Sequence, residues 1–122
     1  MLTPDHFDSQ SAELLRSGRP VLAGISGGRD SMALLSLLSG MPGCNLVACH
    51  VNHQLRPEAE EEEMFVLRYA ASLGIPCVRE RVNVRSMAYT RGIAIEEAAR
   101  EARQASFLKW AAGYPGALVA LA

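Results

Sequence analysis

A turn with two adjacent glycines constrains the fold of this chain most strongly, because it separates two segments of different periodicity. The apolar run 20–25 before the turn is typical of a buried strand, and the apolar run 32–38 after it is typical of a helix. The sequence therefore predicts a strand, a short loop and a helix in direct succession. The turn, here called the glycine loop (residues 26–31), reads Ser26-Gly27-Gly28-Arg29-Asp30-Ser31.

The glycine loop has the properties of an anion-binding turn. Without a Cβ, Gly27 and Gly28 let backbone N–H groups approach a ligand closely. The first turn of the following helix adds N–H groups without intrahelical acceptors and the positive end of the helix dipole. The hydroxyl groups of Ser26 and Ser31 can add further donors. These residues predict a site for phosphate or pyrophosphate, and the alternative is a glycine turn that holds no ligand.

Two other phosphate-binding motifs do not fit the same residues. A Walker loop needs a lysine and then a serine or threonine after its second glycine, whereas Gly28 is followed by Arg29 and Asp30. The dinucleotide fingerprint needs the spacing G-x-G-x-x-G, which Gly24, Gly27 and Gly28 do not supply. Both motifs are therefore excluded.

The segment 24–28 also matches the G-x-S-x-G elbow of the α/β-hydrolases, in which Ser26 would be a nucleophile. In that fold the acid and then the histidine of the triad follow the serine along the chain. Here the last aspartate is Asp30, one helical turn past Ser26, and the last histidine is His53. No triad can be completed within these residues.

Strand-like and helix-like segments alternate along the chain. Strands are expected at 21–26, 46–51, 77–82 and 117–122, and helices at 31–39, 57–73 and 95–112. Pro57 is expected at the first helical position, with the glutamates of 58–63 supporting the helix start. Residues 84–92 are expected to form a short irregular or helical link, and residues 1–18 an N-terminal helical segment, with its helix over 3–18.

This alternation predicts an α/β fold, a three-layer doubly wound parallel sheet with helices on both faces. Ligands of such sheets bind beyond the carboxyl ends of the strands. The glycine loop and the segment 50–56 both follow strands, so we expect them at the same edge.

Composition narrows the class of protein further. The chain has 122 residues, 49% of them hydrophobic, which suits a single globular domain. No apolar run approaches the roughly 20 residues of a membrane span, and no secretory signal opens the chain, so a cytoplasmic protein without a membrane partner is expected. The net charge of −1 argues against a general nucleic-acid binder. Buried free thiols are expected of the unpaired cysteines Cys44, Cys49 and Cys77.

The glycine loop resembles the SGGxDS loop of the PP-loop ATP pyrophosphatase superfamily. The resemblance implies an adenine nucleotide alpha hydrolase-like fold and an enzyme that cleaves ATP to AMP and pyrophosphate while it adenylates a substrate. It also implies that the loop, including the backbone of Arg29, holds the departing pyrophosphate.

Two further segments resemble motifs of one family within that superfamily, the tRNA(Ile)-lysidine synthases. The segment 50–56, His50-Val51-Asn52-His53-Gln54-Leu55-Arg56, resembles their HVxHxLR motif, and 92–103 resembles their helix motif of glycine, glutamate, Ala-Arg and a second arginine. The resemblance implies ATP-dependent ligation of free L-lysine to C2 of the wobble cytidine of tRNA(Ile), through an adenylated intermediate. It also implies adenosine contacts at His50 and Val51, and it leaves a homodimer possible.

The chain departs from this family at two positions and at its end. Gln54 replaces a glycine that is common in the family, and Gln104 replaces an aromatic residue. The family continues beyond the fourth strand into a motif rich in histidine and aspartate, whereas this sequence stops at Ala122. The resemblance therefore implies a truncated PP-loop ATP-binding catalytic domain over 19–122, without the tRNA-binding domains. We expect this chain alone to make no lysidine.

Two side chains are candidate catalytic residues. An acid beside a phosphate site is unfavourable unless a metal intervenes, so Asp30 is predicted to coordinate Mg²⁺, with helix capping as the alternative. Arg100 can bind a phosphate or carboxylate through two hydrogen bonds, and the resemblance favours a substrate or nucleotide contact. Its alternative is a surface pair with Glu96 or Glu97 at helical spacing.

Two other functions remain open at this point. A PP-loop tRNA thiolase would activate its substrate in the same way and then deliver sulfur, but such enzymes commonly show paired cysteines, which this chain lacks. The chain could also be a nucleotide-binding fragment without catalytic activity.

Overall fold

Four parallel strands form the centre of the fold, in the spatial order β3-β2-β1-β4. The computed structural model describes residues 13–121. The strands are β1 (Pro20–Gly24), β2 (Asn45–Asn52), β3 (Cys77–Arg81) and β4 (Leu118–Leu121), and the helices are α2 (Arg29–Ser39), α3 (Ala59–Ser72), α4 (Val84–Arg91) and α5 (Ile95–Gly113). This alternation confirms the predicted α/β class.

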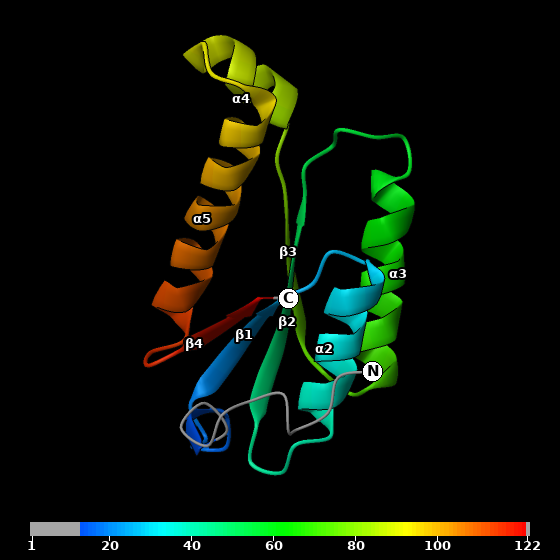
Figure 1. The fold of residues 1–122 in the computed structure, drawn as a ribbon, viewed down its shortest axis with the longest axis vertical. Helices are drawn as coiled ribbons and strands as arrows, with labels where there is room; N and C mark the ends of the chain where they lie inside the picture. Colours follow the sequence, from blue (N-terminus) through cyan, green and yellow to red (C-terminus); the bar gives the residue numbers. More distant parts are fainter. Residues whose placement is uncertain (1–12, 122) are drawn as a thin grey trace.

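Helices cover both faces of the sheet, with α2 and α3 on one face and α5 on the other (Figure 1). Successive side chains of a strand point to opposite faces. Val21 and Ala23 of β1 therefore pack under α2 and α3, while Leu22 packs against Trp110 of α5. The apolar runs are continuous because both faces are buried. The predicted three-layer arrangement is confirmed.

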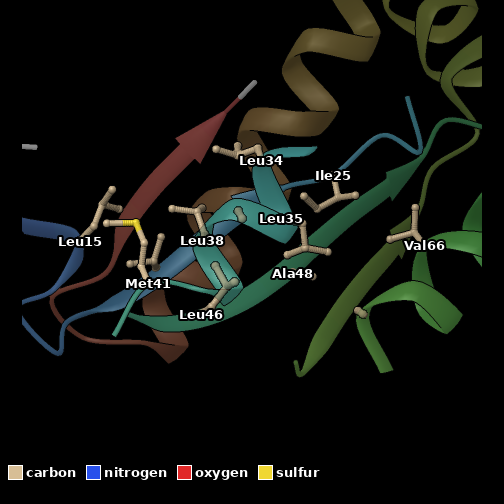
Figure 2. Close-up of a cluster of buried hydrophobic side chains, with 12 residues drawn as sticks. Leu15, Ile25, Leu34, Leu35, Leu38, Met41, Leu46, Ala48 and Val66 are labelled. Carbon is tan, nitrogen blue, oxygen red and sulfur yellow. The ribbon is translucent and has the colours of Figure 1, made fainter. Parts of the chain in front are cut away.

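The larger core lies between the sheet and helices α2 and α3. Figure 2 shows side chains of α2 over β2 in this core, with Val66 of α3 also labelled. Its buried members from these elements include Leu34, Leu35, Leu38, Leu46 and Ala48. A separate cluster joins α4 to α5, where the small residues Ala98 and Ala102 pack against Val84 and Ala88.

The chain reverses its direction across the sheet after β3. Strands β1, β2 and β3 follow one another outward, and the connection through α4 and α5 then brings β4 to the other side of β1 (Figure 1). Such a reversal leaves a crevice beyond the carboxyl ends of the two strands that flank it, here β1 and β4. The glycine loop follows β1 at this point.

Most predicted boundaries agree with the structure within a few residues, but the predicted start of α3 is too early. Pro57 is not the first helical residue, because Ala59 N–H donates to the Arg56 carbonyl across 3.1 Å and closes a turn before the helix begins at Ala59. The link over 84–92 is helical as α4, where the Asn83 side chain caps Ser86 N–H at 3.0 Å.

Part of the predicted N-terminal segment falls outside the described range. Of the helix expected over 3–18, only its end is described: residues 13–15 are helical, and the chain has left the helix by Gly18. Cys49 is buried, Cys44 and Cys77 are half-buried, and all three thiols are free. Between residues 13 and 121 no helix is both long and apolar enough to cross a membrane.

Candidate functional site

The two serines of the glycine loop close it into a compact turn. Ser31 Oγ accepts a hydrogen bond from Ser26 N–H (3.0 Å) and donates one to the Gly28 carbonyl (3.1 Å). Because the Ser31 proton is used in this way, the hydroxyl of Ser26 is the donor in the 3.1 Å contact between the two Oγ atoms. Gly28 N–H in turn donates to Ser26 Oγ at 3.3 Å. Both hydroxyl protons are thus engaged within the loop, and the serines set its shape.

Gly27 occupies a backbone conformation that favours glycine, with φ of +87°. A Cβ at this position would lie 3.7 Å from Val66 Cγ2 and 3.8 Å from Glu62 Cβ, so the loop also packs against α3. Gly28 then caps the N-terminus of α2 in an extended conformation, with φ of −75° and ψ of 162°. The glycine loop is therefore fixed by the start of α2 and by its contact with α3.

Several backbone N–H groups of the loop have no acceptor within residues 13–121. They belong to Gly27, Arg29, Asp30 and Ser31. Groups of this kind at a helix start bind anions well, because they are unpaired and lie at the positive end of the helix dipole. The loop therefore has donors that could bind an anion, and its role as a phosphate site stays a prediction.

A cleft of about 540 Å³ opens at the carboxyl ends of the strands. Its volume lies within the range typical of small-molecule sites. The start of the glycine loop lines it together with the segment after β2, and α5 and β4 contribute the opposite wall. The lining residues on these walls are Gly24, Ile25, Ser26, Ser31, residues 49–56, Arg103, Phe107 and Leu121. The two segments that follow β1 and β2 therefore meet, as the sequence predicts.

Two histidines of the β2 segment face this cleft in different ways. His50 is buried, and its Nδ1 lies 2.6 Å from the Ile25 carbonyl, which can only accept, so Nδ1–H is the donor. His53 Nδ1 is buried and has no hydrogen-bond partner among the described residues. Burial, followed by the charges of Arg103 and His50, lowers the pKa of His53. His53 thus presents a neutral imidazole at neutral pH.

The two candidate catalytic side chains do not line the cleft. Asp30 is exposed in the first turn of α2, beside the unpaired N–H groups. Within residues 13–121 there is no group of three or more side chains suited to holding a metal. Mg²⁺, however, typically takes one or two carboxylates together with phosphate oxygens. Asp30 fits that requirement.

Arg100 is exposed on α5 and contributes nothing to the cleft wall, whereas Arg103 does. The alternative pairs with Glu96 or Glu97 are also not formed in the described structure, in which Arg91 pairs with Glu101. Because Arg103 and Phe107 are one helical turn apart, they present one face of α5 to the cleft. The second arginine of the helix motif is the signal in the sequence that points to Arg103.

The fold is a parallel α/β sheet, and the glycine loop, with N–H groups that lack an acceptor among the described residues, lies where the strand order reverses between β1 and β4. These two features define a class of domains that bind anions beyond the strand ends. Residues 4–122 match the sequence model of the PP-loop domain, so the chain belongs to the PP-loop domain family. The NH3-dependent NAD synthetase from Campylobacter jejuni has a similar fold, with a TM-score of 0.62, 20% identity, and coverage of 93% of this chain and 56% of that one.

Relatives with higher sequence identity include bacterial proteins named tRNA(Ile)-lysidine synthase. The protein from Pseudothermotoga lettingae is 39% identical over 97 residues, which cover 77% of this chain and 22% of the relative. The protein from Bacillus subtilis is 37% identical over 97 residues, covering 77% of this chain and 21% of the relative. The chain thus spans about a fifth of the length of these relatives.

Proposed function

We propose that this chain binds ATP with its glycine loop, as part of a carbon–nitrogen ligase of the tRNA(Ile)-lysidine synthase type. One observation carries the ATP proposal: in the described part of the chain, the glycine loop has four backbone N–H groups without an acceptor, and the same loop contributes Ser26 and Ser31 to a cleft of nucleotide size. The relatives' shared name and their 37–39% identity support the ligase proposal. The reaction would join free L-lysine to C2 of the wobble cytidine of tRNA(Ile).

In this proposal the glycine loop holds the β- and γ-phosphates of ATP, which leave as pyrophosphate. Attack on the α-phosphorus places growing negative charge on the departing group, and fixed N–H dipoles stabilise that charge without having to reorient. One such donor is typically worth about 3 kcal/mol. When bound with ATP, Mg²⁺ would neutralise phosphate charge, and Asp30 is the side chain proposed to hold it.

The remaining cleft residues orient the nucleotide. His50 and Val51, at the end of β2, are proposed to lie against the adenosine. Arg103 is proposed to contact the α-phosphate or the adenylated base, because it is the arginine that α5 places on the cleft wall. Arg100, exposed outside the cleft, remains a candidate contact for the larger tRNA substrate.

The cleft cysteine does not favour the tRNA thiolase alternative. Cys49 lines the cleft, but burial, with a smaller effect of Cys77, raises the pKa of its thiol to about 12. A thiol with such a pKa supplies very little thiolate near neutral pH. Cys49 is therefore poorly suited to carry sulfur.

Calorimetric titration of the chain with ATP and Mg²⁺ tests the proposal. We expect ATP and pyrophosphate to compete for one site, and Asp30→Asn to weaken binding in Mg²⁺ more than in its absence. Ser31→Ala should weaken binding because it removes the bonds that shape the loop. Ser39→Ala, at the opposite end of α2, is the matched control. Absence of ATP binding at millimolar nucleotide would refute the proposal.

A second assay addresses the ligase reaction. Incubation of the chain with tRNA(Ile), lysine and ATP, followed by mass spectrometry of the wobble nucleoside, is expected to show no lysidine, since the named relatives are far longer than this chain. Lysidine formation would disprove the expected inactivity and would directly establish the ligase activity.

A further inference from the structure

Glu63 is a fully buried carboxylate on α3, with 0% of its surface exposed. It belongs to the acidic run 58–63, whose other glutamates are exposed or half-exposed. A buried charge is costly unless it is paired and hydrogen-bonded. Support of the helix start, the role that the sequence predicts for the whole run, does not account for Glu63.

Both oxygens of the Glu63 carboxylate are fully used. Oε1 accepts from Arg81 Nε (3.0 Å) and Asn52 Nδ2 (3.1 Å), and Oε2 accepts from Arg79 Nη1 (2.5 Å) and Arg81 Nη2 (2.9 Å). The hydrogen bonds from Arg81, Asn52 and Arg79 lower the pKa of Glu63 to about 2, against the opposing effect of burial. The carboxylate thus joins α3 to the ends of β2 and β3 as a fixed anion.

Asn52 transmits this anchor to the cleft. Its Nδ2 group faces the Glu63 carboxylate, which accepts only, so Oδ1 must point the other way. Oδ1 accepts a hydrogen bond from Gln54 N–H at 2.9 Å. A turn closed by an asparagine side chain in this way fixes the backbone two residues ahead. Glu63 is the nearest of the acceptors that orient the Asn52 amide, and this orientation determines the path of the next residues.

The residues after Asn52, here called the 53–56 loop, form one wall of the cleft. Gln54 holds a φ of +54°, a left-handed conformation that a glutamine seldom adopts without support. Two further contacts hold the 53–56 loop: Arg56 pairs with Glu62 at 2.5 Å, and Arg85 donates a hydrogen bond to the Leu55 carbonyl at 3.4 Å. Among the described residues, the hydrogen bond from Gln54 N–H to Asn52 is the one that acts at the strained residue.

We propose that Glu63 is a positioning residue of the nucleotide cleft, acting through Asn52 to hold the 53–56 loop in its binding conformation. The inference rests on the proposed ATP function. Glu63 itself does not line the cleft, whereas every residue from Asn52 to Arg56 does. Asn52 Nδ2 also donates to Glu60 Oε1 (3.3 Å) and to the Ala59 carbonyl (3.5 Å), but the Glu63 carboxylate is its nearest acceptor. Loss of the carboxylate therefore loosens the Asn52 amide and weakens the bond that supports Gln54.

The test combines ATP titration with hydrogen exchange of the Gln54 amide, measured by NMR. Glu63→Gln and Asn52→Ala are each expected to weaken ATP binding about 10-fold, the lower end of what supporting residues typically contribute, and to speed Gln54 exchange. The double variant should be no weaker than Asn52→Ala, because both changes break the same chain of contacts. Additive losses, or unchanged binding, would overturn the inference.

Glu80→Gln is the matched control. Glu80 lies on β3 between Arg79 and Arg81, but its side chain pairs with Lys109 of α5 and not with Asn52. It should alter neither ATP binding nor Gln54 exchange. If Glu63→Gln does not fold, Asn52→Ser decides the matter: its hydroxyl can still accept from Gln54 N–H, so it should bind ATP more tightly than Asn52→Ala. Equal affinities of the two Asn52 variants would count against the inference.

Failure of the proposed function would look different. One such outcome is a wild-type chain that binds no ATP and still shows slow Gln54 exchange that both variants accelerate. That result would refute the proposed ATP function but support the role of Glu63 in holding the 53–56 loop. A Gln54 amide that exchanges equally fast in all chains would overturn the positioning role whatever the ATP result.

Discussion

The imidazole of His50 donates from Nδ1 to the carbonyl of Ile25 across 2.6 Å, and this bond ties the end of β2 to the residue that precedes the glycine loop. The backbone adds a second tie at the same point, where Ile25 N–H donates to the Cys49 carbonyl at 2.8 Å. The two cleft-forming segments are thus joined directly, and neither can shift without the other.

Replacing His50 by alanine is expected to destabilise the chain by about 1–3 kcal/mol, because the buried Ile25 carbonyl loses its partner. His53→Ala is the comparison, since His53 Nδ1 makes no hydrogen bond in the described structure and its removal should cost less. Urea unfolding of the two variants measures the difference. Equal losses would show that the His50 bond contributes nothing specific.

Gly27→Ala should lower both stability and ATP affinity, because a residue with a Cβ is strained at a φ of +87° by roughly 1–2 kcal/mol. Gly40→Ala provides the control: Gly40 has a φ of −87°, and a Cβ there meets only the Leu37 carbonyl oxygen at 3.6 Å and the Ser36 carbonyl oxygen at 3.9 Å. Thermal unfolding and calorimetric titration compare the pair. Tolerance of alanine at Gly27 would contradict the geometry assigned to the loop.

Arg103→Ala is expected to weaken ATP binding, whereas Arg100→Ala should leave it unchanged, because only Arg103 is on the cleft wall. A loss of about 10-fold would match the 1.5–3 kcal/mol typical of a hydrogen bond to a charged group, at its lower end. Titration of both variants under the same salt conditions makes the comparison. The opposite ranking would favour Arg100 as the nucleotide contact.

Gln54 should tolerate glycine but not a β-branched residue. Gln54→Gly relieves the strain of a φ of +54° and is expected to change stability by less than about 1 kcal/mol, because glycine also gains entropy in the unfolded chain. Gln54→Val should destabilise by about 1–3 kcal/mol. Urea unfolding of the two variants checks the order, and a valine variant as stable as the glycine variant would show that the loop relaxes.

The lowered pKa of Glu63 makes the free energy of unfolding depend on pH in the acidic range. Its value falls from 4.5 to about 2 on folding, so between these values the unfolded chain binds the extra proton. The stabilisation is complete above pH 4.5 and is lost as the pH falls towards 2; it amounts to about 3 kcal/mol. The stability difference between the wild type and Glu63→Gln should therefore shrink over this range in urea unfolding. A constant difference would mean that Glu63 is already protonated or unpaired.

Local features of the sequence are enough to predict the sheet and the glycine loop. The apolar runs of β1 and β2 and the paired glycines are short-range signals, and each determines a conformation within its own segment. The predicted start of α3 is wrong because the turn at Arg56 uses the backbone before Pro57, and a proline at a helix start carries no information about such a turn.

The side chains of the site depend on distant contacts. The buried carboxylate of Glu63 depends on Arg79 and Arg81 on β3 and on Asn52 on β2, and nothing in the acidic run distinguishes it from its neighbours. Arg103 faces the cleft because of how α5 is rotated against the sheet, which periodicity does not reveal for a helix whose buried face consists mostly of small residues. His53 Nδ1, which has no partner among the residues that the structure describes, likewise owes its environment to packing.

The position of β1 between β2 and β4 has a consequence for the energetics of recognition. Both edges of β1 are paired, so the strand opens to solvent only when much of the sheet unfolds. The end of β1, from which the glycine loop continues, therefore moves very little in the native state. A mobile loop would lose conformational entropy each time it closed on a ligand, and this loss would weaken binding. Here that entropy is lost once, during folding, and an arriving anion meets donors that already point towards it.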